Sequence, residues 1–352
     1  MRSPDPVSPA DDPASERLLE REREELRRAA DAPIPAAPHG VRARVRPTIS
    51  VVIPVYNHAD VIAGAIESAL NQTVPPDEIV VVDDCSEDAE ALVQALEPWI
   101  RDHGVHLHRT PRNSGPAAAR NIGICASHGD LVALLDADDR HEPEHLETAV
   151  DTLLAHPETA MTCADAFQVH RGAMLPGRKN DQWQPIEPVV TFERLLEGNC
   201  ISTLPVVMRR ETYDAFGPFD EAPDLVGVED YDLWLRVSKA REIRYVDRPL
   251  ARYAKSPESI SGDPRRLFRG EAAVFDKLER VVDGFQESHG AIAARRRHEM
   301  RVDLAYNLCT TRDWREALRV AVVAVARRPL SVAGYRVLAR ALLRRTSGEV
   351  QS

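Results

Sequence analysis

The chain has 352 residues, of which 43% are hydrophobic, and it carries a formal net charge of -11 at pH 7. A chain of this length and composition can bury a large core. Its acidic balance argues against a general nucleic-acid binder, which needs a basic surface to hold phosphates, so we expect no nucleic-acid partner. Five widely spaced cysteines without a CxxC pair predict neither a disulfide framework nor a zinc site, which fits a reducing compartment.

Residues 1–46 are rich in Pro, Asp, Ala and Arg. We predict that they form a mobile extension with one charged helix, ASERLLEREREELRRAA, and a Pro-rich linker. The extension has no apolar signal core, and no stretch of the chain approaches the roughly 20 apolar residues of a membrane span. The sequence therefore predicts a cytoplasmic protein with at most peripheral contact at the inner face of the cell membrane.

From residue 49 onward, apolar runs of strand length alternate with amphipathic segments of helical period. The runs that predict strands include ISVVIPVYN (49–57), EIVVVDD (78–84) and DLVALLD (130–136). This alternation predicts an α/β fold, with a Rossmann-like, mainly parallel sheet flanked by helices on both faces. Ligands of such sheets bind beyond the carboxyl ends of the strands.

The alternation becomes irregular after about residue 155. We expect, in order, a strand at 159–170, a Gly/Pro-rich turn, a helix at 191–199, a strand at 202–210, and a loop at 217–240 that ends as a helix. Residues 263–347 are predicted to be all-helical and contain a segment with the spacing of a tetratricopeptide-like hairpin. Because one such unit is not an array, a packing appendage is favoured over a peptide-binding solenoid.

Three acidic clusters follow the predicted elements. They are VVDDCS with Asp83 and Asp84, LLDADD with Asp136, Asp138 and Asp139, and GVEDYD with Glu229, Asp230 and Asp232. The first two clusters end strands of the same predicted sheet, so they should open into one crevice. Taken alone, DADD is better explained as turn residues and a helix N-cap, but the strand context and the first cluster favour a shared ligand site.

Clustered carboxylates repel one another unless a cation neutralises them. Hard cations such as Mn2+ and Mg2+ suit carboxylate oxygens, and Mg2+ in particular shares its coordination sphere between one or two protein carboxylates and substrate phosphates. The sequence therefore predicts that DADD is half of a site for Mn2+ or Mg2+ and a diphosphate.

These motifs carry a family resemblance. The segment ISVVIPVYNHADVIAGAIESALNQTVPPDEIVVVDDCSED, followed in order by NSGPAAARNIGI, GDLVALLDADD and GVEDYDLWLR, resembles the family 2 glycosyltransferases with the GT-A fold over roughly residues 47–255. The resemblance implies a glycosyltransferase domain at 47–258, with a nucleotide-binding half at 47–140 and an acceptor half at 141–258. Residues 259–352 would then be a helical C-terminal region.

The resemblance also implies residues for the donor site. Asp84 would hold the nucleotide base, and Tyr56 would lie near the same base. In the DxD motif, Asp138 would be the metal ligand, with Asp136 beside the ribose or a metal-bound water. Arg120 is a candidate for the diphosphate and is equally well explained as a helix-surface residue. UDP is the expected nucleotide because it is common among relatives.

The third cluster resembles the family's ED motif, which makes Asp230 the general base. A carboxylate within about 3 Å of an acceptor hydroxyl can take its proton as the hydroxyl attacks the anomeric carbon. A single displacement with one base inverts that carbon. We predict that Asp232 and Arg236, four residues apart in the following helix, form an ordinary surface pair. Three neighbouring apolar residues are predicted to be core: Leu233, Trp234 and Val237.

Two positions depart from the family pattern. Cys85 replaces a glycine of the first cluster, which a small side chain tolerates if its φ is not positive. Ser256 stands where many relatives carry a histidine that reaches the metal, so metal affinity or the acceptor loop would differ. The acceptor is an unidentified hydroxyl compound: a glycan, a lipid-linked glycan, a protein or a small molecule.

Alternative interpretations are weaker. A catalytically degenerate GT-A fold acting as a binding module is disfavoured by the retained Asp84, Asp138 and Asp230. A receiver-like regulatory domain predicts its first strand at the acidic pair, whereas a full strand and helix precede Asp83. A dinucleotide oxidoreductase would need GxGxxG after the first strand. Arginines dominate from about residue 291, which fits either a solvated helix face or peripheral contact with an anionic membrane.

Overall fold

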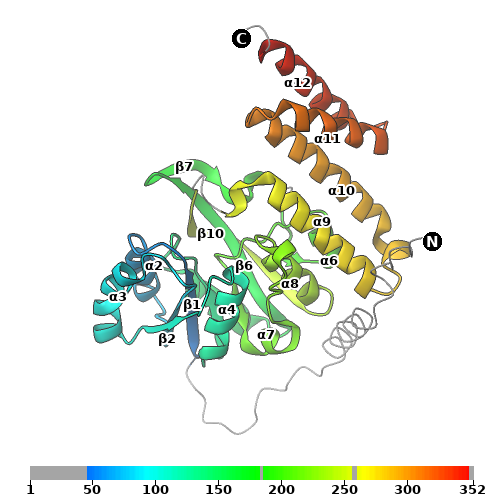
Figure 1. Cartoon of the computed structure of the whole chain (residues 1–352). Helices are drawn as coiled ribbons and strands as arrows, with labels where there is room; N and C mark the ends of the chain where they lie inside the picture. The colour runs from blue at the N-terminus through cyan, green and yellow to red at the C-terminus, as the bar shows by residue number, and fades with distance from the viewer. Residues whose placement is uncertain (1–45, 183–184, 256–259, 349–352) are drawn as a thin grey trace, which may run out of the picture.

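The computed structural model describes residues 46–182, 185–255 and 260–348. The predicted N-terminal extension, apart from Arg46, lies outside the described residues, and so does Ser256. Figure 1 shows an α/β body from which an arm of helices extends toward the C-terminus. The α/β fold class and the C-terminal helices predicted from the sequence are confirmed.

The described residues form one central sheet of ten strands, whose main path is β3-β2-β1-β4-β9-β6-β10-β5. The strands β3, β2, β1 and β4 are parallel to one another. Strand β9 lies antiparallel between β4 and β6, and β6 pairs parallel with β10. The strand bounds on this path are β1 Ile49–Val55, β2 Glu78–Asp83, β3 His106–Arg109, β4 Leu131–Leu134, β5 Arg140–His141, β6 Thr159–His170, β9 Val207–Arg209 and β10 Glu242–Ala254.

The second half of the sheet differs in detail from the sequence-based expectation. Residues expected to form a Gly/Pro-rich turn after β6 instead form β7 (Ala173–Arg178), which pairs antiparallel with β6. The short strand β8 (Val189–Val190) pairs with β10, which the sequence analysis did not predict. Because β7 projects from the end of β6, the hairpin carries the residues after it toward the carboxyl edge of the sheet.

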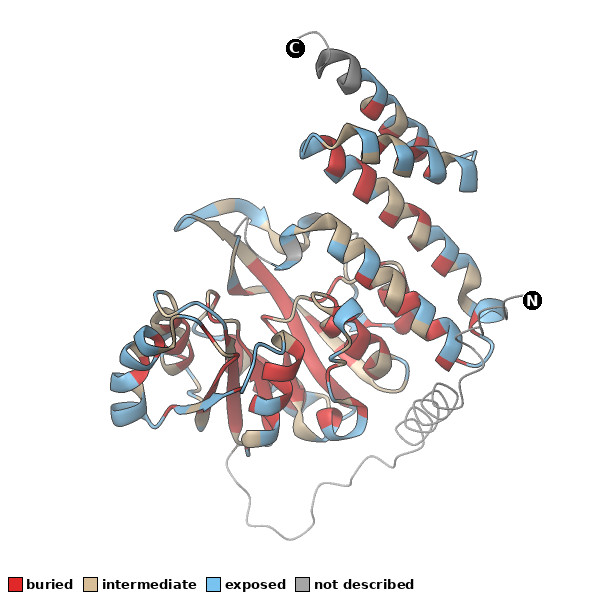
Figure 2. Ribbon diagram, in the orientation of Figure 1, coloured by how far each residue is buried: buried red, intermediate tan, exposed pale blue. Residues whose placement is uncertain are grey.

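Helices cover both faces of the sheet, as its alternating side chains require. In β1, Ile49, Val51 and Ile53 belong to one buried cluster, while Val52 belongs to the cluster on the opposite face. Figure 2 shows these strands buried along the middle of the body. The covering helices are α2 Ile62–Leu70, α3 Ala89–His103, α4 Pro116–Ala126, α5 His145–Ala155, α6 Phe192–Leu196, α7 Arg210–Phe216 and α8 Glu229–Ser238.

Four α-helices of the described residues follow β10, namely α9 Pro264–Val281, α10 Phe285–Thr310, α11 Trp314–Arg327 and α12 Val332–Gly348. Apolar residues of α9 and of α10 as far as Met300, such as Val274 and Phe275, belong to the same core as α6 and α8. The second half of α10 packs with α11 and α12 in small clusters of their own. The body and α9 therefore share a core, whereas α11 and α12 form the arm in Figure 1.

The expectation that Asp232 and Arg236 form a surface pair is wrong. Asp232 is 3% exposed, and although Arg236 Nε donates to its Oδ2 at 3.0 Å, a second cation also reaches it. Lys277 of α9 lies 3.1 Å from Asp232 Oδ1 and 2.7 Å from Asp220 Oδ2. The pair is buried because α9 covers this part of α8, which no local pattern in α8 reveals. The expected core residues Leu233, Trp234 and Val237 are confirmed as buried.

Cys85 has a positive φ of 61°, so the condition under which a side chain would replace glycine without strain is not met. A left-handed residue with a Cβ costs about 1–2 kcal/mol. We expect Cys85→Gly to raise the free energy of unfolding by about 1 kcal/mol, because relief of that strain exceeds the added chain entropy. Urea denaturation measures the change. The matched variant Cys125→Gly, inside helix α4, should destabilise instead, and stabilisation by both would contradict the backbone argument.

Candidate active site

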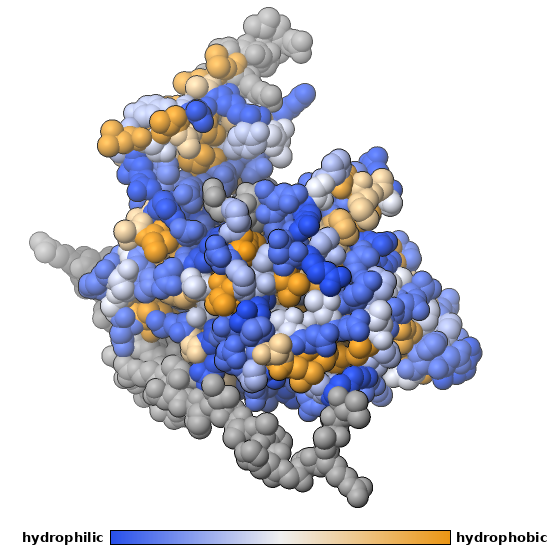
Figure 3. All heavy atoms as spheres, turned by 180° about the vertical axis from the view of Figure 1, so that it is seen from behind, coloured by the Kyte–Doolittle hydropathy of each residue, from blue (hydrophilic) through white to orange (hydrophobic). Residues whose placement is uncertain are grey.

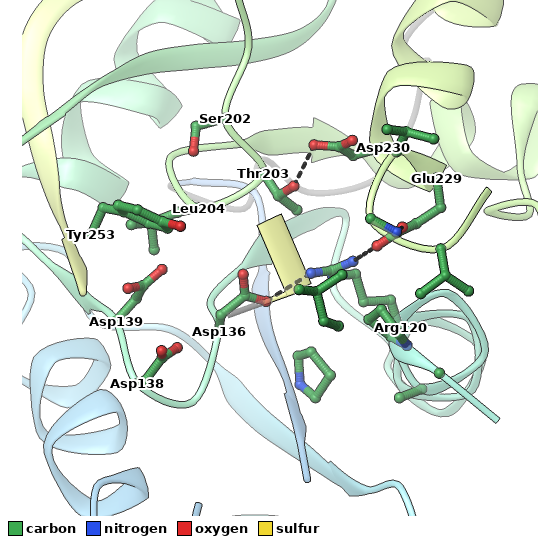
Figure 4. A pocket seen from close by; sticks show the side chains of 18 of the residues that line it. Arg120, Asp136, Asp138, Asp139, Ser202, Thr203, Leu204, Glu229, Asp230 and Tyr253 are labelled. Atoms are coloured by element: carbon green, nitrogen blue, oxygen red, sulfur yellow. Dashed lines mark hydrogen bonds and ion pairs between the residues drawn. The ribbon is translucent and has the colours of Figure 1, made fainter. Parts of the chain in front are cut away.

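A cavity of about 870 Å³ opens at the carboxyl edge of the parallel strands. It is lined by every residue that the sequence analysis assigned to the donor site or to the base: Tyr56, Asp84, Arg120, Asp136, Asp138 and Asp230. The second cluster follows β4 and the first follows β2, which are both parallel to β1. The prediction that the two clusters open into one crevice is therefore confirmed, and the third cluster faces them from the start of α8 (Figure 4).

The Asp84 carboxylate organises one end of the cavity. Its Oδ1 accepts hydrogen bonds from Thr110 Oγ1 at 2.9 Å and from the backbone N–H of Ser114 at 2.9 Å. Its Oδ2 accepts from the N–H of Gly115 at 2.7 Å, just before α4 begins. Asp84 is 4% exposed, so it primarily holds the loop at 110–115, whereas the neighbouring Tyr56 leaves 38% of its surface open.

The loop after β4 concentrates negative charge. Burial and then the neighbouring Asp136 raise the pKa of Asp138. Burial, followed by Asp136 and Asp138, raises the pKa of Asp139 well above its ordinary value, although Asp139 Oδ1 accepts a hydrogen bond from the N–H of Ala254 at 2.6 Å. Since each carboxylate disfavours ionisation of the next, a cation bound among them would be stabilised.

The donor set of this loop fits a hard divalent cation that shares its coordination with a substrate. Asp138 makes no hydrogen bond or ion pair with another described side chain, whereas one oxygen of Asp136 is engaged by Arg120, so Asp138 is the more available ligand of the two. Within the described residues, no three Asp, Glu, His or Cys side chains form a complete ligand cluster. One or two carboxylates completed by phosphate oxygens and water is the arrangement that Mg2+ commonly takes.

Arg120 is buried, which corrects the alternative that it lies on a helix surface. Its side chain is 6% exposed and bridges two acidic clusters. Its Nη2 lies 2.8 Å from Asp136 Oδ1, and its Nη1 lies 2.7 Å from Glu229 Oε1 (Figure 4). Burial lowers the pKa of Arg120, but Asp136 and Glu229 outweigh it and raise the pKa above its ordinary value. The bridge sets how far the loop after β4 lies from the start of α8.

Asp230 lies one residue beyond the end of this bridge, at the first turn of α8. Its Oδ2 accepts a hydrogen bond from Thr203 Oγ1 at 2.7 Å, and Figure 4 shows the pair on the cavity wall opposite Asp136 and Asp138. Burial and then the carboxylate of Glu229 raise the pKa of Asp230 to about 6, against the opposing effects of Thr203 and Arg120. A carboxylate with this pKa is ionised at neutral pH and is a stronger proton acceptor than an exposed aspartate.

The sequence analysis missed Lys179, which lines the same cavity. It opens the short 3-10 helix η2 (Lys179–Gln182) directly after β7. Burial lowers its pKa, against the opposing effect of Asp139, Asp230 and Asp136. The local sequence GRKND indicated only a polar turn. The amino-acid composition could have drawn attention to this residue. Only four of the 45 Lys and Arg residues are lysines, so a lysine is unusual in this chain.

Residues 50–214 match the family model described as "Glycosyl transferase family 2". Among curated proteins, TuaG of Bacillus subtilis (strain 168), named as a teichuronic acid biosynthesis glycosyltransferase, is 28% identical over 67% of this chain and 90% of its own. The succinoglycan biosynthesis protein ExoO of Rhizobium meliloti (strain 1021) is 37% identical over 44% of this chain and 43% of its own. The succinoglycan biosynthesis protein ExoU, from the same organism, is 29% identical over 74% of this chain and 77% of its own.

Solved structures share the fold. TarS residues 1–349 of S. aureus, in complex with UDP, is 21% identical with a TM-score of 0.51, covering 83% of this chain and 90% of that one. The mannosyltransferase PcManGT of Pyrobaculum calidifontis, in complex with GDP-Man and Mn2+, is 20% identical with a TM-score of 0.55. The match covers 93% of this chain and 87% of that one.

Proposed function

We propose that the chain is a family 2 glycosyltransferase, whose model residues 50–214 match, and that it transfers a sugar from a nucleotide-diphosphate donor to a hydroxyl acceptor with inversion at the anomeric carbon. The observation that carries this proposal is the single cavity in which Asp230 faces the carboxylates of the loop after β4. In an inverting displacement, the leaving diphosphate and the attacking hydroxyl lie on opposite sides of the anomeric carbon. The loop after β4 would bind the diphosphate on one side, and Asp230 would meet the hydroxyl on the other.

In this proposal, Tyr56 and the loop shaped by Asp84 receive the nucleotide base. Asp138, with Asp136 beside it, would hold Mn2+ or Mg2+. When bound, such a cation supplies Lewis-acid stabilisation of charge on the diphosphate. Arg120 would position Asp136 through its bridge to Glu229, and its remaining N–H groups would be donors for the diphosphate.

Asp230 acts as the general base. Its Oδ2 is oriented by the Thr203 hydroxyl, so the carboxylate is held toward the cavity as an acceptor hydroxyl approaches. The hydroxyl oxygen attacks the anomeric carbon while its proton passes to Asp230, and the bond from that carbon to the diphosphate oxygen breaks. One base and one displacement give inversion.

UDP is the nucleotide that we propose, and a growing polysaccharide is the acceptor class. Support for UDP comes from the TarS complex, although PcManGT binds GDP-Man. Support for polysaccharide synthesis comes from the printed names of TuaG, ExoO and ExoU.

The Asp138→Ala variant tests the donor site. We expect wild-type protein to bind UDP or GDP in calorimetric titrations with Mn2+, and the variant to lose manganese-dependent binding, because its free carboxylate is the proposed ligand. The matched variant Asp151→Ala, on helix α5 away from the cavity, should bind like wild type. Unchanged binding by Asp138→Ala would refute the metal assignment, and absence of binding by folded wild-type protein would refute the donor site.

We further propose that the arm of helices α11 and α12 contacts an anionic membrane surface. No helix among the described residues has the length and apolar content to cross a bilayer. Residues 317–348 contain seven arginines and neither Asp nor Glu, in a chain with a net charge of -11. Apolar residues are also exposed there, including Leu330 at 96% and Leu343 at 68%. Figure 3 shows hydrophobic and hydrophilic residues together on the helical arm.

Vesicle sedimentation tests this contact. We expect the protein to bind vesicles that contain phosphatidylglycerol and not vesicles of phosphatidylcholine alone. Changing Arg327 and Arg328 together to Gln should weaken binding about tenfold or more, since each basic residue near an anionic surface contributes about 1 kcal/mol. Changing Arg101 and Arg248, exposed arginines of the body, to Gln is the matched control. Equal loss in both variants would indicate net charge alone and contradict a docking role for the arm.

A further inference from the structure

Lys179 is anchored so that its amino group stays in the cavity. Its Nζ donates a hydrogen bond to Ser202 Oγ at 2.7 Å and lies 4.2 Å from the centre of the Tyr253 ring. Figure 4 shows Ser202 and Tyr253 on the cavity wall between Asp139 and Asp230. An ammonium group has three N–H donors, and Ser202 uses one. Donors therefore remain for a ligand, while the ring face stabilises the positive charge.

The surrounding charges place this amino group between the two halves of the site. Asp139 and Asp136 come from the loop after β4, and Asp230 comes from α8, yet all three interact electrostatically with Lys179. In the proposed reaction, the anomeric carbon and the diphosphate oxygen that leaves it must lie between those same two groups. Lys179 is thus positioned beside the bond that breaks.

The other cations of the cavity do not duplicate this position. Among the described residues that line it, the Lys and Arg side chains are Arg120, Lys179 and Arg266. Arg120 is held in ion pairs by Asp136 and Glu229. Arg266 comes from α9, which also contributes Leu267 and Glu271 to the cavity lining. Lys179 differs from Arg120 in its direct contacts, which are a neutral hydroxyl and an aromatic ring, although it too interacts with the loop after β4 and with the proposed base.

We propose that the Lys179 ammonium group donates hydrogen bonds to the β-phosphate of the nucleotide-sugar donor and stabilises the diphosphate as it leaves. This inference rests on the proposed function and adds a catalytic residue to it. As the bond from the anomeric carbon to the β-phosphate oxygen breaks, its electron pair stays on that oxygen. Lys179 keeps its proton throughout, and the proton of the acceptor hydroxyl goes to Asp230, so the step balances without another reactant.

The alternative role is purely structural, in which Lys179 only balances the charge of Asp139 and holds Ser202. The two roles differ in what they do to ligands with and without a β-phosphate. UDP carries this group and UMP lacks it, while both share the base, the ribose and the α-phosphate. A β-phosphate contact affects UDP alone, whereas a distorted cavity affects both nucleotides.

The test is calorimetric titration of UDP and UMP, in Mn2+, into wild type, Lys179→Met and Lys179→Arg. We expect Lys179→Met to raise the Kd for UDP about tenfold or more, as for loss of a hydrogen bond to a charged group, and to leave the Kd for UMP nearly unchanged. Lys179→Arg, which keeps the charge, should recover part of the UDP affinity. Lys239→Met is the matched control, because Lys239 also lies over an aromatic ring, 5.3 Å from Phe192, but outside the cavity.

Each other outcome overturns the inference in a distinguishable way. A parallel loss of UDP and UMP affinity in Lys179→Met would assign Lys179 a structural role. Unchanged affinity for both nucleotides would show that it does not contact the β-phosphate. If wild-type protein prefers guanine nucleotides, GDP and GMP replace the uridine pair with the same expectations. If folded wild-type protein binds neither UDP nor GDP, the proposed function fails, and this inference fails with it.

Discussion

Asp230→Asn is expected to reduce the rate of sugar transfer about 1,000-fold, within the range of losses when a general base is removed, while nucleotide affinity stays close to that of wild type. Asparagine has the shape of aspartate and can still accept the hydrogen bond from Thr203, but it cannot take the acceptor's proton. Transfer to an acceptor and calorimetric binding of UDP should therefore respond differently. The matched control is Asp224→Asn, an exposed aspartate six residues earlier, which should transfer at the wild-type rate.

The pH dependence of the same reaction provides a second readout. Burial and Glu229 raise the pKa of Asp230 to about 6, and the base must be ionised to work. In wild type, kcat/KM should therefore be constant above this pKa and fall about tenfold per pH unit below it. The residual kcat/KM of Asp230→Asn should not show this fall at low pH. If Asp230→Asn lost nucleotide binding and transfer together, Asp230 would not be the base.

Arg120→Met is expected to lower the free energy of unfolding by about 3–5 kcal/mol, the usual cost of removing one partner from a buried ion pair. The substitution keeps the length of the side chain but leaves Asp136 and the buried Glu229 without their shared cation. Chemical denaturation measures the loss. Because the bridge joins the loop after β4 to α8, we also expect the variant to bind UDP and Mn2+ more weakly where it remains folded.

A double variant and an exposed pair serve as controls for this prediction. Adding Glu229→Gln to Arg120→Met removes an uncompensated buried charge and should restore part of the stability. Arg178→Met breaks an exposed pair with Asp247 and should change the stability by less than about 1 kcal/mol. A loss in Arg120→Met as small as that in Arg178→Met would contradict the importance of the bridge.

Much of the first half of the molecule could be predicted from local pattern. The strands β1, β2 and β4 are parallel and buried on both faces, so their sequences are continuous apolar runs. Each is followed by its polar residues at the same edge of the sheet, which is why Tyr56, Asp84, Asp136 and Asp138 could be placed in one cavity. The hairpin strand β7 was not predicted, because its residues are largely exposed and carry no alternating apolar pattern.

The amino-acid sequence by itself determined the α/β order, the three acidic clusters and the resemblance to family 2 glycosyltransferases, because these depend on periodicity and on short motifs. Only the tertiary structure decided which side chains meet across the cavity. Arg120 and Glu229 are 109 residues apart, and Lys179 reaches Ser202 from a hairpin that no local pattern indicated. Asp232 is likewise buried by Lys277, 45 residues later. Such contacts are set by the path of the chain through the sheet and by the helix that covers it, so the partner of a charged side chain cannot be read from its neighbours in sequence.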